Sequence, residues 1–552
     1  MFIYNIADVI IKKGNFLMII KPTKKIIDIN WSKEANSYLC LFLIIFIGLA
    51  IYSNSLNGQF IWDDNVLVKN NDYIKDWSSV DKLFAGNIST YFNGAGLNFY
   101  RPLQIVTYVM DYSLWKLDIK GYHLSNILLH ICVALLIYFF INTLFSDAFL
   151  SCLTSIFFVS HPIHTEAVSY ISGRSDSLSA LFMILCFIFY IKALHAKNMA
   201  FSVIAVLSYI CAILSREASL ILPILFLLYH YAFQKKIQLK IFSLILIISF
   251  IYVLLRLTVL RSLLDNSVHS SGFLERLPGF FVALNNYIRI LVFPYNLHMA
   301  YGIRLFEVRD IRVFAGLFIL VFSLMHAFKA RKNNKLIFFS ISWFFITLLP
   351  VSNLYPINAY MAEHWLYVPS IGIFLLIANG LRYLYRQERF KHVAIFIIMG
   401  LLALNSYLTI MQNEYWKDPV DFYNRTLKYV SSSNPLYLNL GMAYFNIGKK
   451  EEAMSVYKKA IQINPNNADA YNNLGNIYSD IGNETEAILA YKKAIEINPD
   501  YAGAYFNLFL SYFREKQYSM AIKCCDKAIE LGFRIPPDFL KALEPYKNLS
   551  NL

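Results

Sequence analysis

Residues 38–52 read YLCLFLIIFIGLAIY and contain no charged side chain. Similar runs recur, for example IFSLILIISFIYVLL at 241–255 and HVAIFIIMGLLALNSYLTI at 392–410. A helix of about 20 apolar residues crosses the roughly 30 Å hydrocarbon core of a bilayer. Because such runs alternate with short polar loops between residues 38 and 412, the sequence predicts an all-α, polytopic membrane domain.

The composition agrees with this prediction. Hydrophobic residues make up 57% of the 552-residue chain and charged residues 16%, whereas soluble proteins average about 45–50% and about 25%. The net charge of +14 lies largely in loops such as QKKIQLK (234–240) and KARKNNK (329–335). Lysine and arginine in short loops are typical of the cytoplasmic side of a membrane protein. The charge pattern therefore favours a lipid bilayer as partner and no nucleic acid.

Assigning the basic loops to the cytoplasm predicts about eleven crossings, with the N-terminus inside and the C-terminus outside. Residues 1–37 form the cytoplasmic segment, 38–55 the first crossing, retained as an anchor, and 56–120 a long outer loop. The segment 279–297 contains Asn285, Asn286 and Arg289, which are costly at the bilayer centre, so we expect it to be re-entrant or interfacial. The other crossings are expected at 122–145, 147–160, 176–194, 200–215, 218–233, 239–258, 311–329, 336–354, 365–382 and 392–412.

A second domain follows residue 415. Tyr437, Tyr471 and Tyr505 are 34 residues apart, and alanines recur with the same period. A 34-residue period with small residues between aromatic ones is typical of the tetratricopeptide repeat, an α-solenoid of helix pairs. We expect three repeats, at 434–467, 468–501 and 502–535, and a tail at 536–552. The third departs from the pattern at Phe509 and Cys525 and is a candidate cap.

Polar clusters gather in the loops predicted to lie outside. The first, FIWDDNVLVKN (60–70), places Asp63 and Asp64 beside aromatic residues near the membrane surface. Partial desolvation raises the pKa of a carboxyl group toward the range of a general base. We therefore predict that one of the two takes a proton from an acceptor hydroxyl.

Three arginines complete this chemistry. Arg101, Arg174 and Arg216 lie in other loops assigned to the same side, and guanidinium groups pair bidentately with phosphate oxygens. A base and a phosphate clamp at the outer leaflet describe glycosyl transfer from a lipid-phosphate sugar. The lipid tail of such a donor explains why the enzyme is embedded in the membrane.

Taken together, the paired acids, YRPL (100–103), HPIHTEAVSYISGRSDSLSALF (161–182), AEHWLYVPSIG (362–372) and the repeats are similar to one known family. The chain resembles the transmembrane and tetratricopeptide repeat-containing O-mannosyltransferases, from about residue 38 to 535. That family belongs to the GT-C class of membrane glycosyltransferases. The resemblance implies a polyprenyl-phosphate mannose donor, a Ser or Thr hydroxyl as acceptor, and repeats that recruit the acceptor or another protein partner.

The resemblance also implies site residues. Asp63 and Asp64 match the acidic motif of the family's first outer loop, which supplies the catalytic base. The positions that match its other outer-face motifs, with donor-phosphate or substrate-binding roles, are Arg101, His161, His164, Glu166, Arg174, Asp176, Glu363 and His364. Arg216 joins them from the phosphate-clamp argument above.

Several alternatives remain open at the level of sequence. His161, His164 and Glu166 have ligand types that suit a divalent metal, although orienting the substrate or neighbouring loops is the favoured interpretation and no metal is assigned. Arg174 with Asp176, and Arg216 with Glu217, could form local ion pairs. Glu363 could simply favour the positive end of a helix dipole. For the whole chain the rival functions are a membrane-anchored repeat scaffold without activity and a lipid or sugar transporter.

Overall fold

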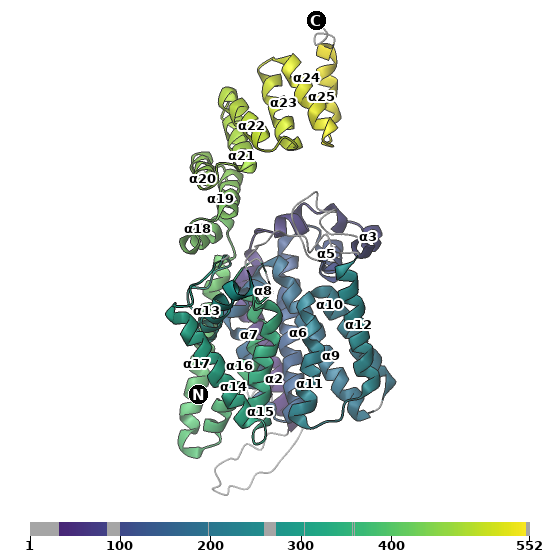
Figure 1. The fold of residues 1–552 in the computed structure, drawn as a ribbon, viewed down its shortest axis with the longest axis vertical. Coiled ribbons are helices and arrows are strands. Elements are labelled where there is room, and N and C mark those ends of the chain that lie inside the picture. The colour runs from purple at the N-terminus through teal and green to yellow at the C-terminus, as the bar shows by residue number, and fades with distance from the viewer. Residues whose placement is uncertain are drawn as a thin grey trace, which may run out of the picture.

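The protein is described here by a computed structural model that covers residues 33–85, 100–196, 198–258, 272–302, 304–355, 357 and 359–547. The described residues form helices and connecting turns with no β-strand. A helical bundle occupies one half of the molecule, and an array of helix pairs extends from one end of it (Figure 1). We call this end of the bundle the repeat-proximal end. Most of the predicted cytoplasmic segment 1–37 lies outside the described residues.

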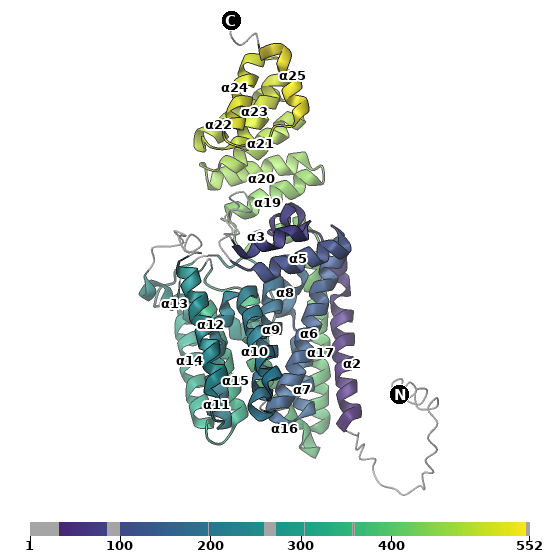
Figure 2. The same cartoon turned by 90° about the vertical axis from the view of Figure 1, so that its right-hand side faces the viewer.

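The helices of the bundle run along its long axis and alternate in direction (Figures 1 and 2). They are α2 (Lys33–Tyr52), α6 (Ile119–Phe145), α7 (Ala148–Ser160), α9 (Arg174–Ala196), α10 (Met199–Ser215), α11 (Leu222–Phe233), α12 (Leu239–Leu257), α14 (Ile311–Ala330), α15 (Lys335–Leu348), α16 (Ser370–Tyr385) and α17 (Lys391–Tyr415). Within the described ranges, six helices are long and apolar enough to cross a membrane, or seven if a bent pair is one span. Four shorter apolar helices accompany them. The multi-pass architecture is thus confirmed, while the number of crossings stays a prediction.

Four further helices lie at the repeat-proximal end. They are α3 (Val80–Ala85), α5 (Pro102–Trp115), α8 (Thr165–Ser169) and α13 (Phe273–Val292). Pro102 occupies the first turn of α5, where its missing N–H costs no hydrogen bond. The two ends of α13 contact loops at this same end, since Arg276 donates to the Asn353 carbonyl oxygen and Leu291 O lies 3.2 Å from His161 Nε2. Both ends of α13 thus lie at the repeat-proximal end, and the interfacial or re-entrant placement of residues 279–297 stays a prediction.

The repeats consist of antiparallel helix pairs. They are α19 (Asn434–Asn446) with α20 (Lys450–Ile463), α21 (Ala468–Asp480) with α22 (Glu484–Ile497), and α23 (Ala502–Arg514) with α24 (Tyr518–Glu530). A preceding helix, α18 (Pro419–Tyr429), packs on α19. The predicted tail contains a further helix, α25 (Pro537–Lys547), which packs on α24 and buries Leu543. The third repeat is therefore covered by α25 and is not itself the outermost layer.

Each repeat pairs a large side chain with a small one. A Cβ atom on Gly441 or Gly475 would lie within 2.6 Å of the ring of Tyr457 or Tyr491, which stands sixteen residues later. In the third repeat the corresponding residues are Phe509 and Cys525, both buried. The large and small residues have exchanged helices, which conserves the volume between them, and such swaps are well tolerated. The larger Phe509 and the smaller Cys525 therefore compensate each other in volume.

We expect Gly475→Ala to destabilise the second repeat. Its methyl group would lie 2.6 Å from Tyr491 Cε1, and Tyr491 is buried with its hydroxyl donating to Asn476. Overpacking of this kind costs about 1–3 kcal/mol. Hydrogen exchange in the full chain should show faster exchange of α21 and α22. Gly503→Ala, whose nearest neighbour is 3.3 Å away, is the matched control, and equal exchange in the two variants would contradict the packing argument.

Candidate active site

A cavity of about 870 Å³ opens at the repeat-proximal end. Its wall is built from the loop at residues 62–67, the turn before α5, the α8–α9 turn, the α10–α11 turn, the end of α12, the loops around residues 299–302 and 350–365, and the start of α19. Six of the eleven predicted site residues line it, namely Asp63, Arg101, Glu166, Asp176, Arg216 and His364. The other five, Asp64, His161, His164, Arg174 and Glu363, lie behind the wall and are buried.

The two adjacent acids face different environments. The preceding residue, Trp62, has a φ of 53°, a left-handed conformation that is rare for a bulky residue and is found at functional sites. Asp64 is 1% exposed, and its carboxylate accepts hydrogen bonds from Ile61 N, Ser172 N and Ser172 Oγ. Asp63 is only partly buried and lines the cavity. Asp64 therefore anchors the loop to the α8–α9 turn, and Asp63 is presented to the cavity.

Burial raises the pKa of Asp63 to about 6, an effect that a hydrogen bond with Tyr170 and the charge of Arg101 partly offset. Burial likewise raises the pKa of Asp64 to about 7, against the hydrogen bonds it accepts from Ser172 and Ile61. A carboxylate with a pKa near 6 is largely ionised at neutral pH and is a stronger base than an ordinary aspartate. The geometry favours Asp63 over Asp64 as a base, because only Asp63 lines the cavity and the Asp64 carboxylate is occupied by hydrogen bonds.

The arginines form ion pairs that differ from those considered from the sequence. Arg216 pairs with Asp176, and Arg101 Nη2 lies 3.1 Å from Glu217 Oε1. The two local ion pairs considered from the sequence, Arg174–Asp176 and Arg216–Glu217, are not among the ion pairs of the described residues. Both actual pairs line the cavity, so Arg101 and Arg216 are already neutralised by carboxylates there.

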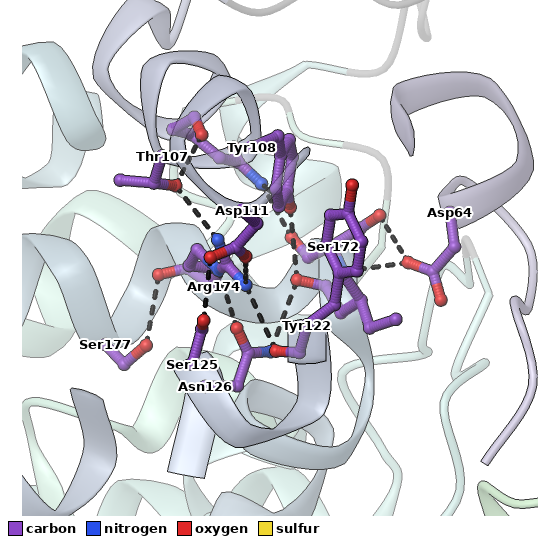
Figure 3. Close-up of polar contacts among 12 residues, drawn as sticks. Asp64, Thr107, Tyr108, Asp111, Tyr122, Ser125, Asn126, Ser172, Arg174 and Ser177 are labelled. Atoms are coloured by element: carbon purple, nitrogen blue, oxygen red, sulfur yellow. Dashed lines mark hydrogen bonds and ion pairs between the residues drawn. The ribbon is translucent and has the colours of Figure 1, made fainter. Parts of the chain in front are cut away.

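Arg174 does not reach the cavity. It is 2% exposed and its Nη2 lies 2.6 Å from Asp111 Oδ2 on α5 (Figure 3). The same guanidinium donates to Asn126 and to the Tyr122 carbonyl oxygen on α6. Its expected contact with a donor phosphate is therefore not supported, because all these contacts hold it inside the protein. It ties α5 and α6 to the start of α9, immediately beside the turn that holds Asp64.

The three residues considered as metal ligands point to different partners. The Nδ1 atom of His161 accepts from Ile163 N, and its Nε2 contacts the Leu291 carbonyl oxygen. The Nε2 atom of His164 lies 3.4 Å from Ser370 Oγ, and Glu166 turns to His364. In the part of the chain that the structure covers, no three His, Cys, Asp or Glu side chains are placed to hold a metal ion. These contacts join the turn at residues 161–166 to α13, α16 and the loop at His364.

Glu363 and His364 belong to a hydrogen-bonded network that forms part of the cavity wall, with Glu363 buried behind it. Glu166 Oε1 lies 2.7 Å from His364 Nδ1, and Glu363 accepts from Tyr301 Oη at 2.6 Å and from His298 N. Burial lowers the pKa of His364 to about 4, so its contact with Glu166 is a hydrogen bond between a neutral ring and a carboxyl group. Burial and the neighbouring Glu166 raise the pKa of Glu363 well above its usual range. Of this network, Glu166, Tyr301 and His364 line the cavity.

The sequence interpretation missed two lining residues on α12, Tyr252 and Arg256. Their spacing of four residues places them on one face of a helix. That spacing was visible in IYVLLRL (251–257). Nothing in the sequence, however, indicated which face of this span meets the bundle.

These features define a class of protein: a multi-pass helical membrane domain with a polar cavity at one end, joined there to tetratricopeptide repeats. Comparison with known families matches TPR repeats at residues 441–482 and tetratricopeptide repeats at 468–501 and 490–523. The repeats predicted from the sequence are thereby confirmed.

The membrane domain also has named relatives. The chain is 24% identical over 472 residues to human protein O-mannosyl-transferase TMTC3, covering 77% of this chain and 51% of that protein. It is 27% identical over 446 residues to the Caenorhabditis elegans protein O-mannosyl-transferase F38B6.6, covering 77% and 63%. These similarities confirm the resemblance predicted from the sequence. The chain spans about half to two-thirds of the length of these relatives.

A likeness to one solved structure is weaker. The crystal structure of ArnT from Cupriavidus metallidurans bound to undecaprenyl phosphate aligns with a TM-score of 0.40 and 14% identity, over 85% of this chain and 81% of that one.

Proposed function

We propose that this protein is a membrane glycosyltransferase that moves one sugar, mannose in view of its relatives, from a polyprenyl-phosphate donor to a Ser or Thr hydroxyl of an acceptor protein. The proposal rests on the carboxyl group of Asp63. In the cavity Asp63 is a partly exposed carboxyl group of raised pKa, and the other aspartate of the pair is fully engaged in structural hydrogen bonds.

The reaction follows from one base in a partly desolvated cavity. Asp63 would take the proton of the acceptor hydroxyl while its oxygen forms a bond to the anomeric carbon. The bond from that carbon to the phosphate oxygen breaks, and polyprenyl phosphate leaves with the electron pair. A single displacement of this kind inverts the anomeric centre. Bound in proximity, the two substrates react without the entropic cost of a bimolecular encounter.

The repeats would deliver the acceptor. Ser433, Pro435 and Leu436, at the start of α19, line the cavity together with Asp63. The neighbouring helix α18 contacts the aspartate loop directly, since Trp62 N donates to Tyr423 Oη at 3.0 Å. A protein segment held on the repeats would therefore lie beside the base. Because basic loops gather at the opposite end of the bundle, we place the cavity and repeats on the extracytoplasmic side.

The test is transfer of labelled mannose from polyprenyl-phosphate-mannose to protein in membranes that contain the full chain. We expect label that β-elimination releases, as for a sugar on Ser or Thr. Membranes without the protein are the control. Glucose and other sugars on the same lipid serve as alternative donors. A folded protein that transfers no sugar from any of these donors would contradict the proposal and favour the scaffold function.

The transfer rate should depend on pH through Asp63. A base acts in its deprotonated form, so kcat/KM should fall as the pH drops through the pKa of about 6 and level off above it. An ordinary aspartate would put this fall near pH 4. Initial rates between pH 4.5 and 8 measure this acidic limb of the pH profile, the fall of kcat/KM toward low pH. Protein stability is checked at each pH. A rate independent of pH across this window would exclude Asp63 as the base.

A further inference from the structure

The two α12 residues that line the cavity are unusual because their polar groups lack partners. Tyr252 is 5% exposed, yet its hydroxyl makes no hydrogen bond within the described ranges. The Nη1 atom of Arg256 is also buried without a hydrogen-bond partner there. Buried polar groups in proteins are almost always paired, and an unpaired one needs an explanation such as an absent ion. Here two donors of hydrogen bonds, four residues apart, line the same cavity.

The charges of the described lining leave Arg256 without an assigned counter-charge. The lining contains three arginines, Arg101, Arg216 and Arg256. Arg101 is paired with Glu217, and Arg216 with Asp176, and a paired guanidinium is a poor anchor for a further anion. No ion pair joins Arg256 to any described residue, and among the lining acids Asp63 forms none either. The cavity thus offers one carboxylate for a base and one guanidinium for an anion.

The position of α12 indicates that the anionic group belongs to a lipid. This helix lies at the periphery of the bundle (Figures 1 and 2), and only 17% of its apolar window is buried. Its buried face runs through Ile245 to Tyr252. Val253 and Leu257 also line the cavity while remaining 40% and 57% exposed on the face where lipid would lie. The anionic site is therefore continuous with a surface that suits a hydrocarbon tail.

We propose that Tyr252 and Arg256 bind the phosphate group of the polyprenyl lipid, with the tail leaving the cavity past Val253 and Leu257. This inference rests on the proposed function for the identity of the lipid. The shared chemistry is a phosphate oxygen that accepts from one hydroxyl and one guanidinium, a charge-assisted pair of hydrogen bonds. Arg256 would compensate the charge that the leaving phosphate gains, whereas Tyr252 would orient it.

The experiment measures binding and needs no transfer. The full chain in lipid nanodiscs is titrated with undecaprenyl phosphate, and the dissociation constant is read from intrinsic fluorescence. We expect Arg256→Gln to weaken binding about tenfold or more, Tyr252→Phe to weaken it a few-fold, and Arg256→Lys to retain part of the affinity. Lys240→Gln, at the exposed opposite end of α12, is the matched control and should bind like the wild type.

Three further ligands identify the source of the phosphate. Undecaprenol, which lacks the phosphate, should bind more weakly and equally to the wild type and Arg256→Gln. Inorganic phosphate and phosphatidic acid should compete poorly. If Arg256→Gln binds undecaprenyl phosphate as the wild type does, or if inorganic phosphate competes as well as the lipid, the inference is overturned. A melting temperature is measured for each variant, and if Arg256→Gln does not fold, Tyr252→Phe and Arg256→Lys decide.

The two proposals can fail separately. Binding that depends on Arg256 without transfer of any sugar would support the lipid site and contradict the glycosyltransferase. Transfer by the wild type with an unchanged dissociation constant and KM in Arg256→Gln would support the enzyme and overturn the site.

Discussion

Replacing Asp63 with asparagine is expected to lower the rate of sugar transfer by a factor of about 10²–10⁴, the usual contribution of a general base. Asparagine has nearly the same size and keeps the backbone hydrogen bond from Asp63 N to Tyr170, but its amide cannot take a proton. The measurement is the initial rate in membranes that contain equal amounts of folded protein. The pH limb near 6 should vanish together with the activity.

Asp64→Asn is the matched control because the two acids are adjacent but differ in role. The Asp64 carboxylate accepts three hydrogen bonds from Ile61 and Ser172. An amide NH₂ in that place would face a donor, which costs about 1–3 kcal/mol of stability. We expect a lower melting temperature and a partial loss of rate, with the pH limb retained. If Asp64→Asn were inactive and Asp63→Asn active, Asp64 would be the base and Asp63 would not.

The features predictable from the sequence are those that depend on local pattern. Long apolar runs gave the helices of the bundle, and the 34-residue period gave the repeats. Alternating crossings also placed the outer polar motifs at one end, where Asp63, Arg101 and His364 meet in the cavity. These features follow from the apolar pattern and the direction of the chain alone. Successive helices run in opposite directions, so every second loop lies at the same end of the bundle.

The partners of charged residues were not predictable, although helix geometry disfavours one of the two local pairs. Residues one or two apart on a helix do not face each other, so Arg174 could not be expected to reach Asp176. Its actual partner, Asp111, is 63 residues away in the sequence on a different helix. Similarly, the helix in the predicted tail depends on the apolar surface that α24 presents to it. Long-range packing decides both, and a single sequence carries no record of it.

The second large effect is expected from Arg174, through stability and not through contact with substrate. Arg174→Met would leave the Asp111 carboxylate, which is about 7% exposed, without its counter-charge. It would also remove the hydrogen bonds that Arg174 donates to Asn126 Oδ1 and to the Tyr122 carbonyl oxygen. Removing one partner of a buried ion pair costs about 3–5 kcal/mol. We expect a markedly lower melting temperature, or little folded protein in the membrane, and a loss of transfer in proportion to the folded fraction.

A double variant separates the effect of the unpaired Asp111 charge from the effect of the hydrogen bonds that Arg174 makes with α6. Replacing the whole buried pair by apolar residues is often neutral, so Arg174→Met with Asp111→Leu should recover a large part of the stability lost by Arg174→Met alone. Activity per folded molecule should recover less, because the α8–α9 turn that holds Asp64 through Ser172 would still lack the hydrogen bond from Arg174 to Asn126 on α6 (Figure 3). Thermal unfolding and initial rates of the single and double variants measure both. If Arg174→Met is as stable as the wild type but has lost transfer, Arg174 contacts the substrate after all.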